Sequence, residues 1–535
     1  MSAHTTETSA AVNYTPLTPL SFLRRSAEVF PTKEAIVYGA RRWDYAAFRA
    51  DAESLATAIR ARIHPGDRVA FLAPNIPETL IAHFAVPLAR GVLVTLNSRL
   101  SAAEIGYILE HSGAKLLFVD AELLATAEAA AEALTAPPEI ISIADPEFGA
   151  LVPEGATSFT AFVDSATHGD PESLSWEVCD ELETISINYT SGTTGRPKGV
   201  MYSHRGAYLN ALGELIHNGF GRDSTYLWTL PMFHCNGWCT PWAVTAAAAT
   251  HVCLRAVRPQ AVWDAIDEHA VTNLCGSPTV CSTIANADQA HPLDRRVRIT
   301  TAGSAPSPTI IELLERLNFD VVHVYGLTEV YGPFTINEHQ PAWDELPAAD
   351  RADRVARQGV AMIQADAPRI VDEDMNDVPR DGVTVGEIVL RGNNVMLGYF
   401  HDDDATAAAF AGGWFHSGDL GVMHPDGYVE LKDRAKDIII SGGENISTIE
   451  VENAILSFPA VLDVAVIGIP HERWGERPLA YVVARPGLSV QVGELLDHVR
   501  GRLAGFKVPD AVRIVEELPR TATGKVQKFE LRNAG

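Results

Sequence analysis

The sequence is poor in several features that would point to particular classes of protein. It has six cysteines among 535 residues, five of them between Cys235 and Cys281, which does not suit the disulfide framework of a secreted domain. With a formal net charge of −26, it lacks the basic excess that a nucleic-acid-binding surface needs. These shortages predict reduced thiols in a cytoplasmic protein that has no nucleic-acid partner.

The sequence also lacks an apolar run long enough to span a bilayer. The run AVTAAAATHVCL at 243–254 is far shorter than the roughly 20 residues that a transmembrane helix needs. The first twenty residues have neither a basic start nor an uninterrupted apolar stretch, so they do not predict a secretory signal. We expect a core segment at 243–254 and no transmembrane segment.

Two familiar templates for metal and nucleotide sites fail. The stretch HCNGWC at 234–239 lacks the fourth ligand and the spacing of a zinc site, so pocket or core packing is favoured. In YTSGTTGRPKGV at 189–200, Lys198 is followed by Gly199, whereas a P-loop needs Ser or Thr after its lysine. Glycines, hydroxyl groups and an ammonium group still suit phosphate oxygens. The loop therefore predicts phosphate binding of another kind.

Alternating strand and helix patterns indicate the fold. RVAFLA (68–73) and GVLVTLN (91–97) read as strands around a helix at 77–90, and a further strand at 115–120 follows a helix at 101–113 that starts with a capping box. This alternation predicts an α/β fold, with a large N-terminal domain of parallel or mixed sheets covered by helices.

The last hundred residues have a different order of helix and strand patterns. Helix patterns at 450–458 and 493–506 flank two apolar strands at 461–469 and 478–485. They predict a small α+β domain at the C-terminus. The segment 337–357 reads as a solvated connection. In the run HDDDATAAAF at 401–410, the acidic residues read as capping an Ala-rich helix.

Five motifs carry a resemblance to a known family. They are YTSGTTGRPKG, VYGLTE (324–329), SGDL (417–420), DRAKDIIISGGENI (433–446) and PRTATGK (519–525). In this order the chain resembles, from about residue 20 to 530, the adenylate-forming superfamily of acyl-CoA synthetases, amino-acid-activating domains and luciferases. The stretch LPMFHCNGWC at 230–239 is most similar to acyl-CoA synthetases for short- and medium-chain or aromatic acids.

The resemblance implies an acid–CoA ligase that uses ATP, Mg²⁺ and CoA. A carboxylate attacks the α-phosphate of ATP and expels pyrophosphate, and the CoA thiol then attacks the acyl-adenylate and expels AMP. Because both reactants in the first step are anionic, positive charge must be placed where they meet. The resemblance also allows a homodimer.

The resemblance assigns ATP-site roles to residues of the motifs. Those implied to bind the nucleotide are Thr190, Ser191, Gly192, Thr193, Thr194, Gly195, Lys198, Gly303, Ser304, Ala305, Pro306, Tyr325, Gly326, Asp419 and Arg434. Within this set, Tyr325 would stack on adenine, and Asp419 and Arg434 would contact the ribose. Glu329 would bind Mg²⁺ with Thr193, and Thr328 would contact the α-phosphate.

The remaining roles concern catalysis and movement. Lys525 would bridge the acid carboxylate and the α-phosphate during adenylation. The resemblance implies an adenylation domain over 1–433, a hinge at 434–436 with Lys436 as the hinge residue, and a mobile lid domain over 437–535. Rotation of the lid would bring in a CoA channel formed by Ser441, Gly442, Gly443 and Glu444.

The acyl pocket is expected around His234, Trp238 and Cys239, with His234 as a gate towards the CoA thiol. The segment 231–240 contains no acidic residue that could pair with the ammonium group of an amino acid. Bulky apolar walls favour a short- or medium-chain aliphatic acid. Aromatic and methylthio-alkanoic acids are the alternatives. A ligase for a carrier protein, a luciferase-like oxygenase and a non-catalytic nucleotide-binding relative are further alternatives.

Overall fold

The first sheet of the computed structural model is mainly parallel. The structure describes residues 13–165, 174–190, 196–302, 308–434, 436–441, 444–521 and 526–534. Within these residues the first sheet has seven strands, in the order β18 (Gly398–Tyr399), β8 (Gly199–Ser203), β7 (Thr184–Tyr189), β4 (Val92–Thr95), β3 (Arg68–Leu72), β5 (Leu116–Asp120) and β6 (Glu139–Ile143). The strands β7, β4, β3, β5 and β6 run parallel, and β8 and β18 are antiparallel additions.

The second sheet is also mainly parallel. Among the described residues its order is β15 (Val360–Ala361), β14 (Gly332–Ile336), β13 (Phe319–Leu327), β12 (Val297–Thr301), β11 (Asn273–Gly276), β9 (Thr225–Leu227), β10 (Thr250–Val252), β1 (Glu34–Tyr38) and β2 (Arg41–Asp44). The six strands from β13 to β1 are parallel to their neighbours, and the outer pairs are antiparallel.

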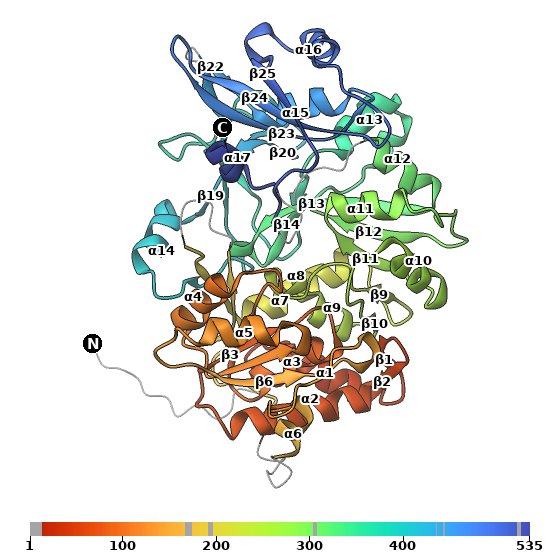
Figure 1. Cartoon of the computed structure of the whole chain (residues 1–535), viewed down its shortest axis with the longest axis vertical. Coiled ribbons are helices and arrows are strands. Elements are labelled where there is room, and N and C mark those ends of the chain that lie inside the picture. The colour runs from red at the N-terminus through yellow and green to blue at the C-terminus, as the bar shows by residue number, and fades with distance from the viewer. Residues whose placement is uncertain are drawn as a thin grey trace.

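Helices cover both sheets (Figure 1). The α-helices before the C-terminal unit are α1 (Leu20–Val29), α2 (Tyr45–Arg60), α3 (Pro77–Leu88), α4 (Ala102–Ser112), α5 (Leu124–Ala131), α6 (Phe159–Asp164), α7 (His204–His217), α8 (Cys235–Trp238), α9 (Thr240–Ala246), α10 (Pro259–Glu268), α11 (Pro278–Ala285), α12 (Pro308–Arg316), α13 (Ala348–Val355) and α14 (Asp403–Ala409). Short 3₁₀ turns are η1 (Ala121–Leu123), η2 (Pro146–Phe148), η4 (Thr328–Val330), η5 (Pro341–Glu345), η6 (Ala411–Gly413) and η7 (Gly505–Lys507).

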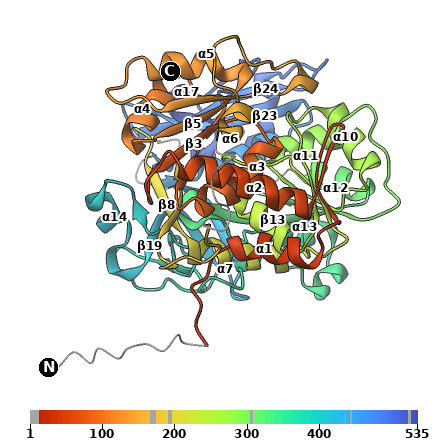
Figure 2. The same ribbon diagram turned by 90° about the horizontal axis from the view of Figure 1, so that it is seen from below.

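The alternation of side chains along β3 shows why helices lie on both faces of the first sheet. Val69 and Phe71 belong to one buried cluster, which includes residues of α2 and α3. Ala70 and Leu72 belong to another, which includes residues of α4 and α5. Successive residues of a strand point to opposite faces, so a strand that is apolar throughout needs cover on each side. Figure 2 shows α2 and α3 side by side below the sheet.

An antiparallel sheet links the large body to a C-terminal unit, which lies at the top of Figure 1. The linking sheet contains β16 (Arg369–Val371), β17 (Gly386–Leu390), β19 (Phe415–Met423) and β20 (Val429–Arg434). The C-terminal unit contains β21 (Ile439–Ser441), β22 (Glu444–Ile446), β23 (Val461–His471), β24 (Gly475–Ala484), β25 (Ala511–Val515), α15 (Thr448–Leu456), α16 (Val492–Arg500) and α17 (Lys528–Ala534). Its two buried clusters hold only residues after Lys436.

The observed elements confirm the predicted fold class. The capping box is present, because the Ser101 hydroxyl accepts from the Glu104 amide at 3.4 Å and the Ser101 amide donates to the Glu104 carboxylate at 2.9 Å. Asp402 caps α14, accepting from the Ala405 amide at 3.0 Å. The domain boundaries at 433 and 437 stay predictions.

Two sequence-based interpretations were wrong in detail. The segment 337–357, read as a solvated connection, contains η5 and α13, and it buries Trp343 against Tyr428 at a ring-centroid distance of 5.3 Å. The helix expected at 493–506 ends at Arg500, followed by Gly501, which disfavours continuation of a helix. The apolar run at 243–254 is confirmed as a core segment, divided between α9 and β10.

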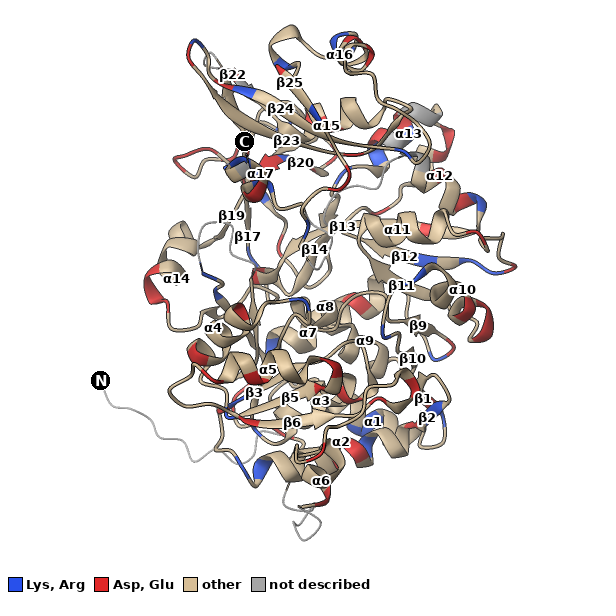
Figure 3. Ribbon diagram, in the orientation of Figure 1, with Lys and Arg blue, Asp and Glu red and all other residues tan. Residues whose placement is uncertain are grey.

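Acidic residues outnumber basic ones, 68 against 42, and Figure 3 shows acidic residues on α10 and α14. All six cysteine thiols are free. In the portion of the chain that the structure describes, no helix combines the length and the hydropathy required to cross a membrane.

Candidate active site

The loop 228–239, between β9 and α9, is fastened to the carboxyl-terminal edge of the first sheet. Asn75, which follows β3, donates to two main-chain carbonyl oxygens of this loop at 2.9 Å and accepts from the Met232 amide at 2.8 Å. Thr95, the last residue of β4, donates to the Phe233 carbonyl oxygen at 3.1 Å. This is the edge at which open parallel sheets commonly bind ligands. The loop predicted to line the acyl pocket therefore lies where the fold favours a site.

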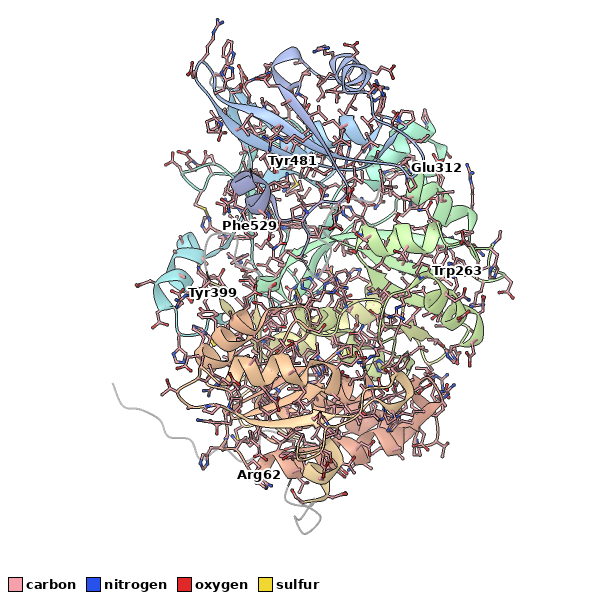
Figure 4. All side chains as sticks on the ribbon, in the orientation of Figure 1. Arg62, Trp263, Glu312, Tyr399, Tyr481 and Phe529 are labelled. Atoms are coloured by element: carbon pink, nitrogen blue, oxygen red, sulfur yellow. The ribbon has the colours of Figure 1, made fainter. Side chains whose placement is uncertain are left out.

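Tyr399 lies between two predicted phosphate-site residues. Its hydroxyl group donates to Glu329 Oε1 at 3.0 Å, and Lys198 Nζ lies 4.5 Å from the centroid of its ring. Burial and the neighbouring Glu329 carboxylate raise the pKa of Tyr399, so the phenol stays a neutral donor. Figure 4 labels Tyr399 beside α14, where its amide donates to Thr406. The predicted magnesium ligand and the predicted phosphate lysine are thus brought together by one aromatic ring.

The turn η4, which carries Thr328 and Glu329, is held by groups on several elements. Tyr202 of β8 donates its hydroxyl hydrogen to the Thr328 carbonyl oxygen at 2.6 Å. The Met396 amide donates to the Glu329 carbonyl oxygen at 2.8 Å. The Cys235 thiol lies 3.5 Å from Thr328 Oγ1. The first two contacts fix the backbone of η4, and the third touches the Thr328 side chain. Thr328 and Glu329 are therefore held at the end of β13.

His234 lies next to this turn. Both of its ring nitrogens lie 3.8 Å from Cys235 Sγ, and that sulfur contacts Thr328. The predicted gate residue and the predicted α-phosphate contact are therefore separated by one cysteine side chain.

Asp419 is held by two of the residues predicted to bind the nucleotide. Its Oδ2 accepts from the Tyr325 hydroxyl group at 2.8 Å, and its Oδ1 lies 3.4 Å from Arg434 Nε. Asp419 and Arg434 are paired across β19 and β20. Burial, with the neighbouring Asp419, raises the pKa of Tyr325 well above its usual range. A carboxylate offers about four acceptor positions, so these two contacts leave acceptor capacity for a vicinal diol.

Two glycines allow a close approach of β13, β14 and the 228–239 loop. A Cβ atom on Gly326 would lie 1.7 Å from the Gly332 carbonyl oxygen, and one on Gly332 would lie 2.6 Å from Trp238 Cδ1. Gly332 also has φ of +105°, which disfavours other residues. Trp238 thus packs directly on the backbone of β14, and the neighbouring Cys239 is fully buried.

The base of the predicted phosphate loop is closed by a pair of hydrogen bonds. The Thr190 amide donates to the Lys198 carbonyl oxygen at 3.0 Å, and the Lys198 amide donates to Thr190 Oγ1 at 3.4 Å. These contacts continue the pairing of β7 with β8. The ends of the loop are therefore fixed at the edge of the sheet.

Some predicted site residues lie outside the described residues. They are Ser191, Gly192, Thr193, Thr194, Gly195, Gly303, Ser304, Ala305, Pro306, Gly442, Gly443 and Lys525.

The predicted hinge and CoA channel lie where the linking sheet meets the C-terminal unit. Lys436 is exposed between β20 and β21. Ser441, at the end of β21, is paired in antiparallel register with Glu444 at the start of β22. Beside the hinge, Asp437 pairs with Arg532 of α17 at 2.6 Å.

Reasoning from the sequence missed Tyr399 and Asn75. Tyr399 belongs to a two-residue strand, too short for a periodic signal, and Asn75 reads as an ordinary turn residue. Both become informative only when the partners from distant parts of the chain are known.

Comparison with known proteins identifies the family. A model of the AMP-binding enzyme family matches residues 23–400, and a model of the AMP-binding enzyme C-terminal domain matches residues 450–525. The chain belongs to the AMP-binding enzymes.

Relatives of this AMP-binding enzyme are CoA ligases. It is 44% identical to an acetate–CoA ligase of Humulus lupulus, over 98% of this chain and 95% of the relative. It is 41% identical to a peroxisomal trans-cinnamate:CoA ligase of Petunia hybrida, over 97% and 94%. It is 42% identical to a peroxisomal acetate/butyrate–CoA ligase of Arabidopsis thaliana, over 97% and 95%.

Solved structures of this family agree with that result. The o-succinylbenzoate CoA synthetase of Bacillus subtilis, in complex with its acyl-adenylate intermediate, is 27% identical with a TM-score of 0.81, covering 96% of this chain and 97% of that one. ATP-bound MatB of Rhodopseudomonas palustris is 28% identical with a TM-score of 0.82, covering 96% and 98%. The chain is an ATP-dependent acid–CoA ligase, as the resemblance implied.

The cytoplasmic location expected from the sequence was wrong by the same comparison. Several relatives are named as peroxisomal, among them the Petunia and Arabidopsis ligases. The expectation rested on the small number of cysteines and on the polar first residues. Neither feature distinguishes the cytoplasm from the interior of an organelle that also keeps thiols reduced.

Proposed function

We propose that this ligase acts on short- or medium-chain aliphatic acids. The observation that carries the proposal is the packing of Trp238, a predicted wall of the acyl pocket, on the backbone of Gly332, because a large indole held at that wall would limit the depth of the pocket. An apolar pocket of fixed depth distinguishes acids by about 1–3 kcal/mol per methylene group. The acetate and butyrate named for relatives support the same class of substrate.

The reaction has two steps on the proposed site. An acid carboxylate oxygen forms a bond to the α-phosphorus of ATP while the bond to the β-phosphate bridging oxygen breaks, and pyrophosphate leaves. The thiolate sulfur of CoA then forms a bond to the acyl carbon, the bond from that carbon to the AMP oxygen breaks, and AMP leaves. Lys198 and the hydroxyl groups of the 190–195 loop would hold the departing phosphates, and Thr328 would contact the α-phosphate.

The residues present fit a Mg²⁺ ion that is bound mainly by ATP. Glu329 offers a carboxylate oxygen whose position is fixed by Tyr399, and Thr193 would add a hydroxyl group. Over the described ranges, no group of three or more His, Cys, Asp or Glu side chains is placed to hold a metal ion, as expected where phosphate oxygens complete the ligand set. A bound Mg²⁺ would neutralise phosphate charge.

A rotation of the C-terminal unit is proposed to convert the site from the first step to the second. Lys525 would bridge the acid and the α-phosphate in the first step. A rotation about Lys436 would withdraw it and bring the segment 441–444 to the pantetheine arm. The exposed position of Lys436 between β20 and β21 supports this assignment.

A pyrophosphate-release screen tests the proposed substrate class. Linear acids from acetate to dodecanoate, branched acids, cinnamate, benzoate and methylthiopropanoate would be compared with and without CoA. We expect the short and medium linear acids to give the highest kcat/KM, with AMP and acyl-CoA formed in equal amounts when CoA is present. Preference for dodecanoate would contradict the role of Trp238. The variant Trp238→Ala is expected to move the optimum towards longer acids.

An aromatic acid is the second candidate, because one relative is named as a trans-cinnamate:CoA ligase. A higher kcat/KM for cinnamate or benzoate than for any linear acid would favour it, and methylthiopropanoate tests the thioether alternative. Acyl-AMP that is transferred to a carrier protein but not to free CoA would favour a carrier-protein ligase. A homodimer also stays a prediction, which sedimentation velocity would test.

A further inference from the structure

The short element α8 is a left-handed turn, not a right-handed helix, and together with Cys239 it forms the end of the 228–239 loop. Five consecutive residues have positive φ, with values of 48°, 42°, 53°, 55° and 60° at Cys235, Asn236, Gly237, Trp238 and Cys239. Only one of them is glycine, and left-handed backbone is unfavourable for residues that carry a Cβ atom. Such a turn persists only where its surroundings hold it.

The side chain of Asn236 is the buried centre of those surroundings. Asn236 is fully buried. Its Oδ1 accepts from Ser186 Oγ at 2.7 Å and from Asn188 Nδ2. The backbone amide of Asn236 donates to Asn188 Oδ1 at 3.0 Å, and the side-chain Nδ2 of Asn236 lies 3.3 Å from His83 Nε2. Each polar atom of the Asn236 side chain therefore has a partner.

Chemistry fixes the direction of these hydrogen bonds. His83 Nδ1 lies 2.8 Å from the Thr79 carbonyl oxygen, which can only accept, so Nδ1 carries the proton. Burial lowers the pKa of His83 to about 4, and its ring is neutral near pH 7. Nε2 is then an acceptor, and the Asn236 amide group is the donor that faces it. No other arrangement of Asn236 oxygen and nitrogen satisfies the three neighbours.

The hydrogen bonds of Asn236 connect two parts of the predicted site. One is β7, the strand that leads to the phosphate loop, and the other is the predicted wall of the acyl pocket. Ser186 and Asn188 belong to β7, whose end enters the loop at Thr190. On the other side of Asn236, Cys235 contacts Thr328, and Trp238 packs on Gly332. Asn236 itself lies between these groups and is separated from solvent. Ser186 and Asn188 are held by the pairing of β7 with β4 and β8, so a shift of the Asn236 backbone would move Cys235 and Trp238 and leave β7 in place.

We propose that Asn236 is a positioning residue that sets the shape of the acyl pocket by holding residues 235–239 against β7. It does so without touching the acid. The inference rests on the proposed function, because it takes Trp238 and Cys239 as pocket walls. Asparagine suits the position on two grounds, since it tolerates left-handed backbone better than most residues and its amide supplies both the acceptor and the donor that the neighbours require.

Two substitutions of Asn236 distinguish the effect of backbone strain from the effect of losing the side-chain hydrogen bonds. Asn236→Ala removes the side-chain hydrogen bonds and adds strain, whereas Asn236→Gly removes the same side-chain bonds and relieves strain. Both variants keep the backbone hydrogen bond to Asn188 Oδ1. With whichever acid the wild-type enzyme prefers, we expect both variants to raise the acid KM by roughly tenfold and to weaken chain-length selectivity. The KM for ATP should stay within about twofold of wild type. If backbone conformation alone mattered, Asn236→Gly would behave as wild type, which would overturn the proposal.

Asn318 provides a matched control. It also has positive φ, 70°, and its Nδ2 donates to the Leu293 carbonyl oxygen at 3.2 Å. It precedes the first residue of β13, whereas Tyr325 and Thr328 lie at the other end. Asn318→Ala should lower the melting temperature and leave the acid KM and the selectivity unchanged. Equal kinetic behaviour of the Asn236 and Asn318 variants would show a merely structural role and overturn the proposal.

Ser186→Ala gives a milder test if the Asn236 variants do not fold. It removes one of the two donors to Asn236 Oδ1 and should move the acid KM and selectivity in the same direction by a smaller factor. Unchanged selectivity in a folded Ser186→Ala enzyme would count against the proposal. The proposed substrate class is decided separately, by the wild-type screen, because this comparison uses ratios to wild type on its own best acid.

Discussion

At the scale of single residues, Tyr399 makes two contacts of different chemistry. Its hydroxyl group orients the Glu329 carboxylate, and its ring face lies under the Lys198 ammonium group. A cation over an aromatic ring gains about 0.5–2 kcal/mol, depending on exposure. The ring thus helps to keep Lys198 near the predicted phosphate site when no nucleotide is bound, and the hydroxyl group keeps Glu329 turned towards the same place.

Tyr399→Phe should separate these contacts. It removes the hydrogen bond to Glu329 and keeps the ring under Lys198. We expect kcat for pyrophosphate release to fall by about tenfold and the requirement for Mg²⁺ to rise, because the carboxylate loses a charge-assisted hydrogen bond. Titration of activity with MgCl₂ measures this. Tyr399→Leu, which also removes the ring, should in addition raise the KM for ATP; identical behaviour of the two variants would contradict the role of the ring.

Lys525→Ala should affect one half-reaction. The ammonium group is proposed to act where the acid meets the α-phosphate, and removal of such a charge costs about 10²–10³ in rate. We expect acyl-AMP formation to fall by that factor while thioester formation from supplied acyl-AMP remains near wild type. Rapid-quench measurement of both steps checks this. An equal loss in both steps would refute the role.

Much of the candidate site could be predicted at this scale, but only through motifs. Lys198, Glu329 and Asp419 stand in motifs with fixed order, and the structure brings Lys198 and Glu329 together through Tyr399. Tyr399 and Asn236 could not be predicted, because the meaning of each depends on partners between 48 and 201 positions away in the sequence. A single tyrosine or asparagine has no local signal that distinguishes it from a core or turn residue.

At the scale of elements, strand and helix patterns predicted most of the first sheet. Continuous apolar runs bounded by turn residues appear as β3, β4 and β5, and the capping box marks the start of α4. The short β18 and the turn α8 gave no such signal. Their conformation depends on pairing with β8 and on the side chains around Asn236, so tertiary contacts override the local preference.

Lys436→Pro tests the hinge between β20 and β21. Proline fixes φ near −65° and removes a backbone donor, so it should restrict rotation of the C-terminal unit. We expect adenylate formation to be spared and thioester formation to fall by about tenfold or more. Lys436→Ala, which keeps backbone freedom, is the control and should retain both steps. Equal loss of both steps in the proline variant would count against Lys436 as the hinge.

At the scale of the whole molecule, buried histidines are found far apart in the fold. Their places are α3 (His83), α7 (His204), β10 (His251) and β13 (His323). Burial lowers the pKa of His83, His204 and His323 to about 4, and that of His251 to about 3. An unfolded histidine has a pKa of about 6.5. In the folded protein these four rings therefore stay neutral near pH 7. They become protonated only at a pH well below the pKa of an unfolded histidine.

The sign of the resulting pH dependence follows from proton counting. Below pH 6.5 the unfolded chain binds protons that the folded chain does not, so the free energy of unfolding should fall as the pH drops from 6.5 towards 4. Each histidine contributes up to about 1.4 kcal/mol per pH unit. Glu214, whose pKa burial raises to about 8, opposes this trend, as do Asp51, Glu78 and Glu452, whose pKa values burial also raises. His111, His269 and His498, whose pKa values burial lowers, reinforce the trend. Melting temperatures across this range measure the effect, and a constant melting temperature would contradict it.

The hydrogen bonds that hold the 228–239 loop have a consequence for which of its side chains can be replaced. Asn75, Thr95 and Asn188 hold the loop by its main-chain amide and carbonyl groups. Such contacts do not depend on which side chains the loop presents to a substrate. Substitutions at predicted wall positions such as Trp238 would therefore leave the course of the loop beside the predicted nucleotide site unchanged. Such substitutions would change which acid is accepted without a change in the main-chain contacts that hold the loop at the sheet.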